Sequence, residues 1–136
     1  MENYFQPKFD IRQVNAISNL GLAHIGDGVY ELLCRTYLCI GGDQTVLKLH
    51  KDTVALVKAP TQAAFADKIK PHLTEEELAW FKRGRNNHTM SKPKNATAAD
   101  YRKATGLEVM FAYLYLTEQQ ERMHELFSIG FENKDN

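Results

Sequence analysis

Two acidic residues stand in apolar, helix-like surroundings that give them no neighbouring positive charge. Asp27 lies within Ile25-Gly26-Asp27-Gly28, inside one apolar run, and Glu108 lies inside another. No Lys or Arg stands three or four residues from either acid, the spacing at which side chains meet on a helix. Asp27 has a like charge, Glu31, at that spacing. A charged carboxylate on a mostly apolar face needs a cation or a raised pKa.

A single divalent cation would neutralise both carboxylates if two crossing helices brought Asp27 and Glu108 together around it. Mg²⁺ prefers hard oxygen ligands and commonly takes one or two carboxylates, with water and substrate phosphate completing its shell. The glycines beside Asp27 favour this arrangement, because each costs a helix about 1 kcal/mol relative to alanine and suggests close approach by another backbone or a ligand. Two plainer readings stay open: each acid pairs with a distant Arg, or Gly-Asp-Gly is only a turn.

Apolar residues at helical spacing predict the elements that must hold these acids. We expect helices over about 20–40, 46–58 and 60–69, with Gly41-Gly42 ending the first. Capping boxes at Thr74 and Thr97 predict two more helices, joined by a polar loop over 86–97, and a final amphipathic helix holds Met123 and Leu126. The expected fold is one all-α domain over residues 1–136, with six or seven helices.

A basic zone interrupts an otherwise neutral chain. The formal net charge is zero, but residues 82–103 carry seven bases against one acid. Such a zone is enough to contact phosphates, and a solvated loop with ordinary surface lysines is the alternative. The residues of this zone that we expect to make such contacts are Arg83, Arg85, Asn86, Lys92, Lys94, Arg102 and Lys103.

Composition excludes several other classes of protein. The chain has 136 residues and 43% hydrophobic residues, enough for a core without disulfides. Cys34 and Cys39 lack the spacing of a zinc or redox motif, and we expect both to be buried thiols. No stretch is long enough to span a membrane and no signal peptide is apparent, so we expect a cytoplasmic protein without a membrane partner.

Two segments resemble known motifs. Residues 19–31, with Gly-Asp27 at their centre, resemble the signature helix of the ribonuclease III catalytic domain, and residues 105–116, with Glu108, resemble that family's second motif. The Mini-III branch is the closer match, because of Leu-Ala-His-Ile-Gly-Asp27, the segment 81–86 with Pro93-Lys94-Asn95 after it, and Tyr101-Arg102. The resemblance covers nearly the whole chain, from 19 to 131.

This resemblance implies a magnesium-dependent endoribonuclease that cleaves double-stranded RNA. Asp27 and Glu108 match the two carboxylates that the family uses as catalytic residues and metal ligands, for Mg²⁺ or, as a substitute, Mn²⁺. It further implies a homodimer formed through the signature helix, maturation of large-subunit (23S) ribosomal RNA precursors, and a ribosomal protein as a possible partner. Mini-III members are bare catalytic domains, so we expect no separate RNA-binding domain.

Two departures from the wider family keep alternatives open. Ala23 and Thr105 stand where the larger enzymes carry further acids, a reduction that Mini-III members share. A catalytically silent RNA-binding or ribosome-assembly factor on the same fold is therefore the main rival, and a helical protein-interaction module is a third reading. The apolar signature helix also suits burial within one monomer as well as a dimer interface.

Overall fold

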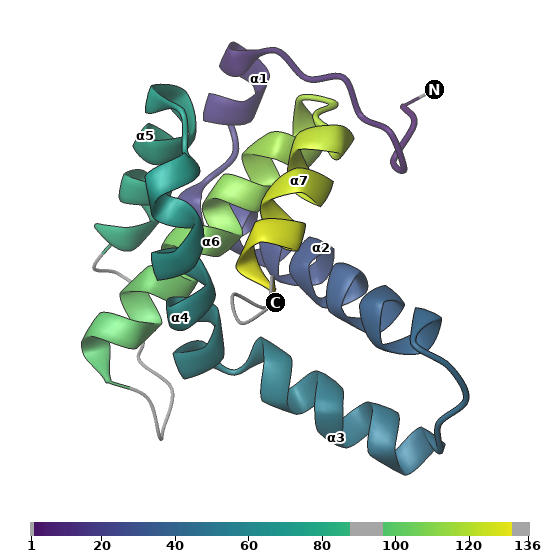
Figure 1. The fold of residues 1–136 in the computed structure, drawn as a ribbon. Helices are drawn as coiled ribbons and strands as arrows, with labels where there is room; N and C mark the ends of the chain where they lie inside the picture. The colour runs from purple at the N-terminus through teal and green to yellow at the C-terminus, as the bar shows by residue number, and fades with distance from the viewer. Residues whose placement is uncertain (1, 88–96, 132–136) are drawn as a thin grey trace.

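The computed structural model describes residues 2–87 and 97–131, where every regular element is helical (Figure 1). The helices are α1 (Ile11–Asn15), α2 (Asn19–Ile40), α3 (Val46–Val57), α4 (Ala59–Ile69), α5 (Glu75–Arg85), α6 (Ala98–Leu116) and α7 (Gln120–Gly130), with a 3₁₀ turn at Lys70–His72. The prediction of an all-α fold with six or seven helices is confirmed. Within these residues no helix is both long and apolar enough to cross a bilayer.

Side-chain oxygens set the start of most of the long helices. Ser18, Thr45, Thr74 and Thr97 each accept the backbone N–H of the residue three positions later. At Thr74 the predicted capping box is complete, because the Glu77 carboxylate also accepts the Thr74 N–H. These caps satisfy backbone groups that a helix leaves unpaired at its N-terminus, and so fix where α2 and α6 begin.

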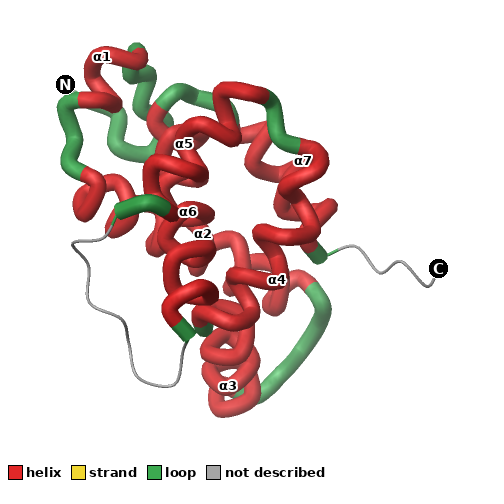
Figure 2. The backbone as a smooth tube through the Cα atoms, turned by 90° about the vertical axis from the view of Figure 1, so that its left-hand side faces the viewer, coloured by secondary structure: helices red, strands yellow, loops and turns green. Residues whose placement is uncertain are grey.

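Helix α6 is the central element of the bundle. It contacts α2, α4, α5 and α7, which surround it in both views (Figures 1 and 2). Leu107, Met110, Phe111 and Leu114 are fully buried, because α6 is apolar on nearly all sides. Glu108 therefore belongs to the most buried helix of the protein, which makes its charge expensive.

Tyr30 holds α2 in register against the rest of the core, one turn after Asp27. Its ring is fully buried and packs against Phe65 of α4, with ring centroids 5.5 Å apart, and against Phe111 of α6 at 6.1 Å. Its hydroxyl donates a hydrogen bond to the Leu56 carbonyl oxygen of α3 at 3.2 Å. One side chain thus ties four helices together beside Asp27.

The two cysteines differ in their surroundings. Cys34 is fully buried, as predicted, but Cys39 is exposed, so the prediction of a buried thiol is wrong there. The reason is the length of α2, whose C-terminal end projects from the bundle alongside α3 (Figure 1). An apolar run continues there without a core to cover it.

Candidate active site

Helices α2 and α6 cross in direct backbone contact at Gly26. A Cβ atom added to Gly26 would lie 1.7 Å from the main-chain oxygen of Glu108, a distance that no side chain tolerates. Gly28, in contrast, has nothing within 4 Å of its would-be Cβ. The backbone approach that the sequence suggested takes place at Gly26, and it sets Asp27 beside Glu108.

The Asp27 and Glu108 carboxyl groups are hydrogen-bond partners. Asp27 is exposed, whereas Glu108 is half-buried. Burial, and after it the charge of Asp27, raises the pKa of Glu108 to about 8. Burial and the charge of Glu31 raise the pKa of Asp27 as well, although His24 acts in the opposite direction. The pair therefore resists full ionisation and would gain from a nearby positive charge.

No side chain in the described part of the protein supplies that charge through an ion pair with Asp27 or Glu108. The nearest arginine on α2, Arg35, is paired with Glu31 at 2.8 Å. The alternative in which each acid pairs with a distant arginine does not hold for these residues. Among residues 2–87 and 97–131, Asp27 and Glu108 therefore form a carboxyl pair that has no ion-pair partner.

A third helix contributes Gln62, which the sequence analysis did not single out. Gln62 of α4 is 2% exposed, and its side chain hydrogen-bonds to the Glu108 carboxylate, which favours the ionised form. A signal was present in the sequence. Gln62 falls on the same helical stripe as Phe65, Ala66 and Ile69, and all three are buried. A polar residue on a core-facing stripe needs a specific partner.

A hard divalent cation fits this set of donors. Within residues 2–87 and 97–131, no group of three or more His, Cys, Asp and Glu side chains is placed to hold a metal. A site of two carboxylates suits Mg²⁺, which retains several waters and leaves positions for substrate phosphate. Zinc, which commonly takes three or four protein ligands, suits it less well.

Known proteins share both the sequence and the fold. Residues 20–119 match the Ribonuclease III domain family. The chain is 46% identical over 123 residues to the Mini-ribonuclease 3 of Clostridium tetani, covering 90% of this chain and 80% of that protein. It is 38% identical over 120 residues to the Mini-ribonuclease 3 of Enterococcus faecalis, covering 87% and 91%. This chain belongs to the ribonuclease III family.

A solved structure agrees with that assignment. The crystal structure of a protein from Fusobacterium nucleatum superposes with a TM-score of 0.75 at 32% identity, covering 86% of this chain and 93% of that one. The chain is thus an endoribonuclease of the ribonuclease III family, with its Mini-ribonuclease 3 proteins as relatives.

The reduced acid set of this family member is visible in its packing. Ala23, one turn before Asp27, is 3% exposed, and Thr105 is equally buried. The Thr105 hydroxyl donates to the Tyr101 carbonyl oxygen at 3.0 Å and is used within α6. Neither position supplies a carboxylate, whereas larger ribonuclease III enzymes are expected to carry an acid at each of them.

Arg83 is engaged within the protein. Its guanidinium donates to the side-chain oxygens of Asn19 at 2.6 Å and Asn15 at 2.9 Å, and to the Ile17 carbonyl oxygen at 3.3 Å. It also lies over the Trp80 ring, 4.8 Å from the centroid. This placement favours a structural role, fastening α5 to the start of α2, over the RNA contact expected from the sequence.

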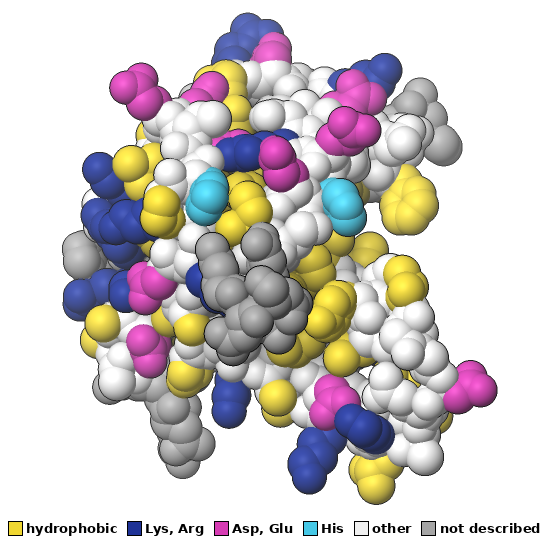
Figure 3. Space-filling view, in the orientation of Figure 1, with side chains coloured by type: hydrophobic (Ala, Val, Ile, Leu, Met, Phe, Trp, Pro, Cys, Tyr) yellow, Lys and Arg dark blue, Asp and Glu magenta, His cyan; other side chains and the backbone are white. Residues whose placement is uncertain are grey.

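The other residues assigned to RNA contact are more open. Arg102 and Asn86 are exposed, and Arg85 is half-buried, with its Nε donating to Asn86 Oδ1 at 3.2 Å. Lys103 pairs with Asp67 at 3.0 Å. Lys and Arg side chains gather along the left-hand edge of Figure 3, the edge that α5 occupies in Figure 1. The predicted contacts Lys92 and Lys94 lie outside the described residues.

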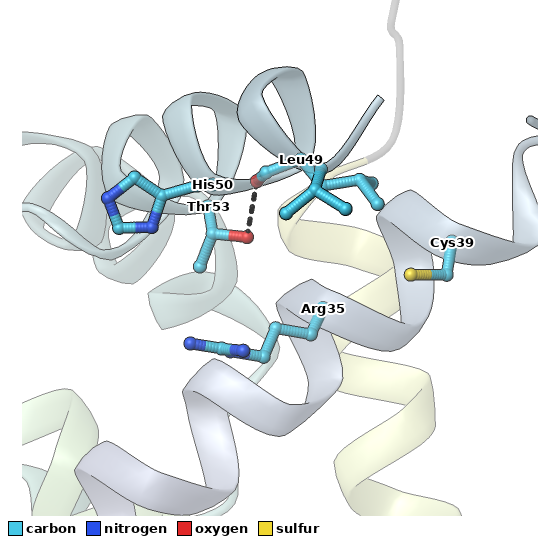
Figure 4. A pocket seen from close by; sticks show the side chains of 6 residues that line it. Arg35, Cys39, Leu49, His50 and Thr53 are labelled. Carbon is cyan, nitrogen blue, oxygen red and sulfur yellow. Dashed lines mark hydrogen bonds between the residues drawn. The ribbon is translucent and has the colours of Figure 1, made fainter. Parts of the chain in front are cut away.

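A pocket lies between α2 and α3 (Figure 4). Its lining residues are Arg35, Cys39, Val46, Leu49, His50 and Thr53. The Thr53 hydroxyl is used internally, donating to the Leu49 carbonyl oxygen at 2.8 Å. With no carboxylate in its lining, this pocket does not compete with Asp27 and Glu108 for a divalent cation.

We predict that Gly26→Ala disrupts the site through the helix crossing. Its methyl group has no room against the Glu108 main chain, so α2 and α6 must separate, at a cost of about 3 kcal/mol in the free energy of unfolding. Gly28→Ala is the matched control and should be neutral or stabilising by up to about 1 kcal/mol. Urea denaturation measures both, and equal stability of the two variants would contradict the crossing.

We predict a pH-dependent stabilisation of the metal-free protein by Glu108→Gln. Because the pKa of Glu108 is raised when folded, the unfolded chain loses this proton first, and wild-type stability falls as the pH rises from about 4.5 towards 8. The variant lacks this loss, so its urea midpoint should exceed that of wild type increasingly up to pH 8. Added Mg²⁺ should shrink the difference.

The control for this experiment is Glu121→Gln, at an exposed position of α7. It should show no growing advantage over wild type across the same pH range. A constant difference between Glu108→Gln and wild type from pH 5 to pH 8 would show that the Glu108 carboxyl is not held in its neutral form.

Proposed function

We propose that this protein hydrolyses double-stranded RNA with Mg²⁺ bound between Asp27 and Glu108, and that Mn²⁺ can replace Mg²⁺. The observation that carries the proposal is the contact of these two carboxyl groups at the α2–α6 crossing, where neither forms an ion pair with a described residue. A bound Mg²⁺ would activate water and offset the charge of the scissile phosphate.

The two acids have different tasks in this proposal. Glu108 is held by the core and by Gln62, so it gives the site a fixed oxygen ligand. Asp27 is exposed, which lets it meet an ion that a phosphate also reaches. Both carboxyls must lose their protons to bind the ion, and its charge stabilises the ionised forms that burial disfavours.

Duplex RNA would lie over the basic edge of the molecule. Proteins recognise such a duplex mainly by its shape and by phosphate and 2′-hydroxyl contacts across the shallow minor groove. The contacting residues in this proposal are Arg85, Asn86, Arg102 and Lys103, together with Lys92 and Lys94. Arg85 and Asn86 end α5, and α5 packs directly on α6, the helix that carries Glu108.

A homodimer would place one such site on each RNA strand. On α2, Leu20 and Leu32 are 55% and 56% exposed, and a groove runs past Leu32 between α2 and the N-terminal segment, where Tyr4 and Phe5 are about 80% exposed. Exposed apolar side chains grouped around a groove are typical of an interface. A two-fold axis through this face suits a substrate with two antiparallel strands.

The substrate class in this proposal is the precursor of large-subunit (23S) ribosomal RNA, with a ribosomal protein as a further partner. The similarity to Mini-ribonuclease 3 proteins supports it. Cleavage of such a precursor at defined sites, against a random duplex of equal length, is the comparison that tests this choice.

Asp27→Asn should abolish RNA cleavage while the protein remains folded. The amide removes a negatively charged metal ligand at an exposed position, so the cleavage rate should fall by more than the 10–100-fold typical of residues that only support a ligand. The assay is cleavage of a long RNA duplex with and without Mg²⁺, with unchanged circular dichroism as the control.

Two results of this assay would count against the proposal. Cleavage by Asp27→Asn at the wild-type rate would remove Asp27 from the metal site. Binding of duplex RNA by the wild-type protein, without any cleavage in Mg²⁺ or Mn²⁺, would favour the silent RNA-binding factor.

Arg85→Ala should weaken binding of duplex RNA and flatten its dependence on salt. Loss of one phosphate contact reduces the slope of log affinity against log salt concentration by about 1. Binding is measured by fluorescence anisotropy with Asp27→Asn protein, which cannot cut the probe. The matched control is Lys48→Ala on α3. The Lys48 ammonium group forms an ion pair with Asp52 at 2.7 Å. Equal slopes for both variants would exclude Arg85 from the RNA contact.

A further inference from the structure

The Gln62 side chain links Val57 to Glu108 in the interior. Its Nε2 donates to the Val57 carbonyl oxygen, at the end of α3, at 2.8 Å, and its amide also hydrogen-bonds to the Glu108 carboxylate. A backbone carbonyl oxygen can only accept, so the amide nitrogen must face Val57. The orientation of this amide thus follows from its surroundings.

This orientation leaves the Gln62 carbonyl oxygen without a partner. Its Oε1 is buried and accepts no hydrogen bond from the protein in residues 2–87 and 97–131. Buried polar atoms are nearly always paired, with protein or with water, so an acceptor left open beside an acid pair points to a bound ligand such as an ordered water. A residue kept only for packing would be better served by an apolar side chain.

We propose that Gln62 is the positioning residue of the metal site, an inference that rests on the proposed cation at Asp27 and Glu108. Its amide N–H holds the Glu108 carboxylate in one orientation and favours the charged form. Its buried carbonyl oxygen would accept a hydrogen bond from an ordered water. Gln62 is thus the outer partner that a ligating carboxylate requires, and such partners typically contribute 10–100-fold in metal affinity.

The chain offers a matched control in Gln44. Its Nε2 donates to the Leu38 carbonyl oxygen at 3.2 Å, and its Oε1 is likewise buried without a partner in the described residues. Gln44 lies in the connection between α2 and α3, and it is not among the groups that act on Asp27 or Glu108. Replacing either glutamine by methionine removes a similar set of hydrogen bonds, but only Gln62→Met removes one to the Asp27–Glu108 pair.

The first experiment measures Mn²⁺ affinity by electron paramagnetic resonance on the full chain without RNA. Gln62→Met should raise the Mn²⁺ dissociation constant about 10-fold or more, while Gln44→Met leaves it unchanged. Thermal unfolding, run in parallel, should show both variants folded. An unchanged dissociation constant in Gln62→Met would overturn the positioning role.

The second experiment uses the wild-type chain, so that it stands even where Gln62→Met fails to fold. Mg²⁺ is titrated into ¹⁵N-labelled protein while the side-chain amide resonances are followed by NMR. The Gln62 amide should shift with the same midpoint as metal binding, and the Gln44 amide should stay in place. A Gln62 amide unmoved at saturating Mg²⁺ would contradict the proposal.

Asp27→Asn separates this inference from the function on which it rests. If Asp27→Asn binds Mn²⁺ with wild-type affinity, the proposed metal site at Asp27 and Glu108 is wrong. If Asp27→Asn loses binding while Gln62→Met keeps it, the cation site stands and the role given to Gln62 is wrong.

Discussion

The contact between two backbones, at Gly26 of α2 and Glu108 of α6, is the constraint on which the site depends. Helices packed through side chains usually lie 8–10 Å apart, a separation set by the residues at the contact. The absence of a side chain at Gly26 lets α2 approach the Glu108 main chain directly. Asp27, the next residue, is then close enough to hydrogen-bond to Glu108. The buried Tyr30 ring and the caps of α2 and α6 maintain the register of this crossing.

The crossing has an electrostatic cost that the rest of the fold must offset. Two carboxyl groups meet at the edge of the most buried helix, and burial raises the pKa of each. Elsewhere the protein pairs such charges, as in the buried Glu77, which accepts hydrogen bonds from Arg122 at 2.8 and 2.9 Å. Asp27 and Glu108, in contrast, form no ion pair within residues 2–87 and 97–131, and perturbed acids without such a partner are typical of a functional site.

Much of this arrangement could be predicted from the sequence, because helical periodicity and caps are local signals. Residues within one or two helical turns were enough to predict the long helices and the lack of a neighbouring Lys or Arg beside Asp27 and Glu108. The short α1 was not predicted, since five residues show little periodicity and its start depends on an Asp10–Gln13 capping box. Which glycine makes the close contact also had to come from the structure, because Gly26 and Gly28 differ only in what lies opposite them.

Contacts between residues far apart in the sequence explain the remaining differences between the predicted and the observed site. Arg83 belongs to a basic stretch that suggested RNA contact, but its partners Asn15 and Asn19 are more than 60 residues away in the chain. Gln62 meets Glu108 only because α4 and α6 pack together. Neither contact could be predicted from the spacing of residues within one helix. Such spacing indicates which face of a helix is apolar, but not which other helix packs against that face.

The central claim, that the crossing of α2 and α6 makes Asp27 and Glu108 share one cation, is tested most directly by anomalous diffraction from crystals soaked in Mn²⁺. The account predicts an anomalous peak within coordination distance of a carboxylate oxygen from each residue. A peak bound to only one of these acids or located elsewhere, or carboxyl groups that lie apart in the crystal, would contradict it.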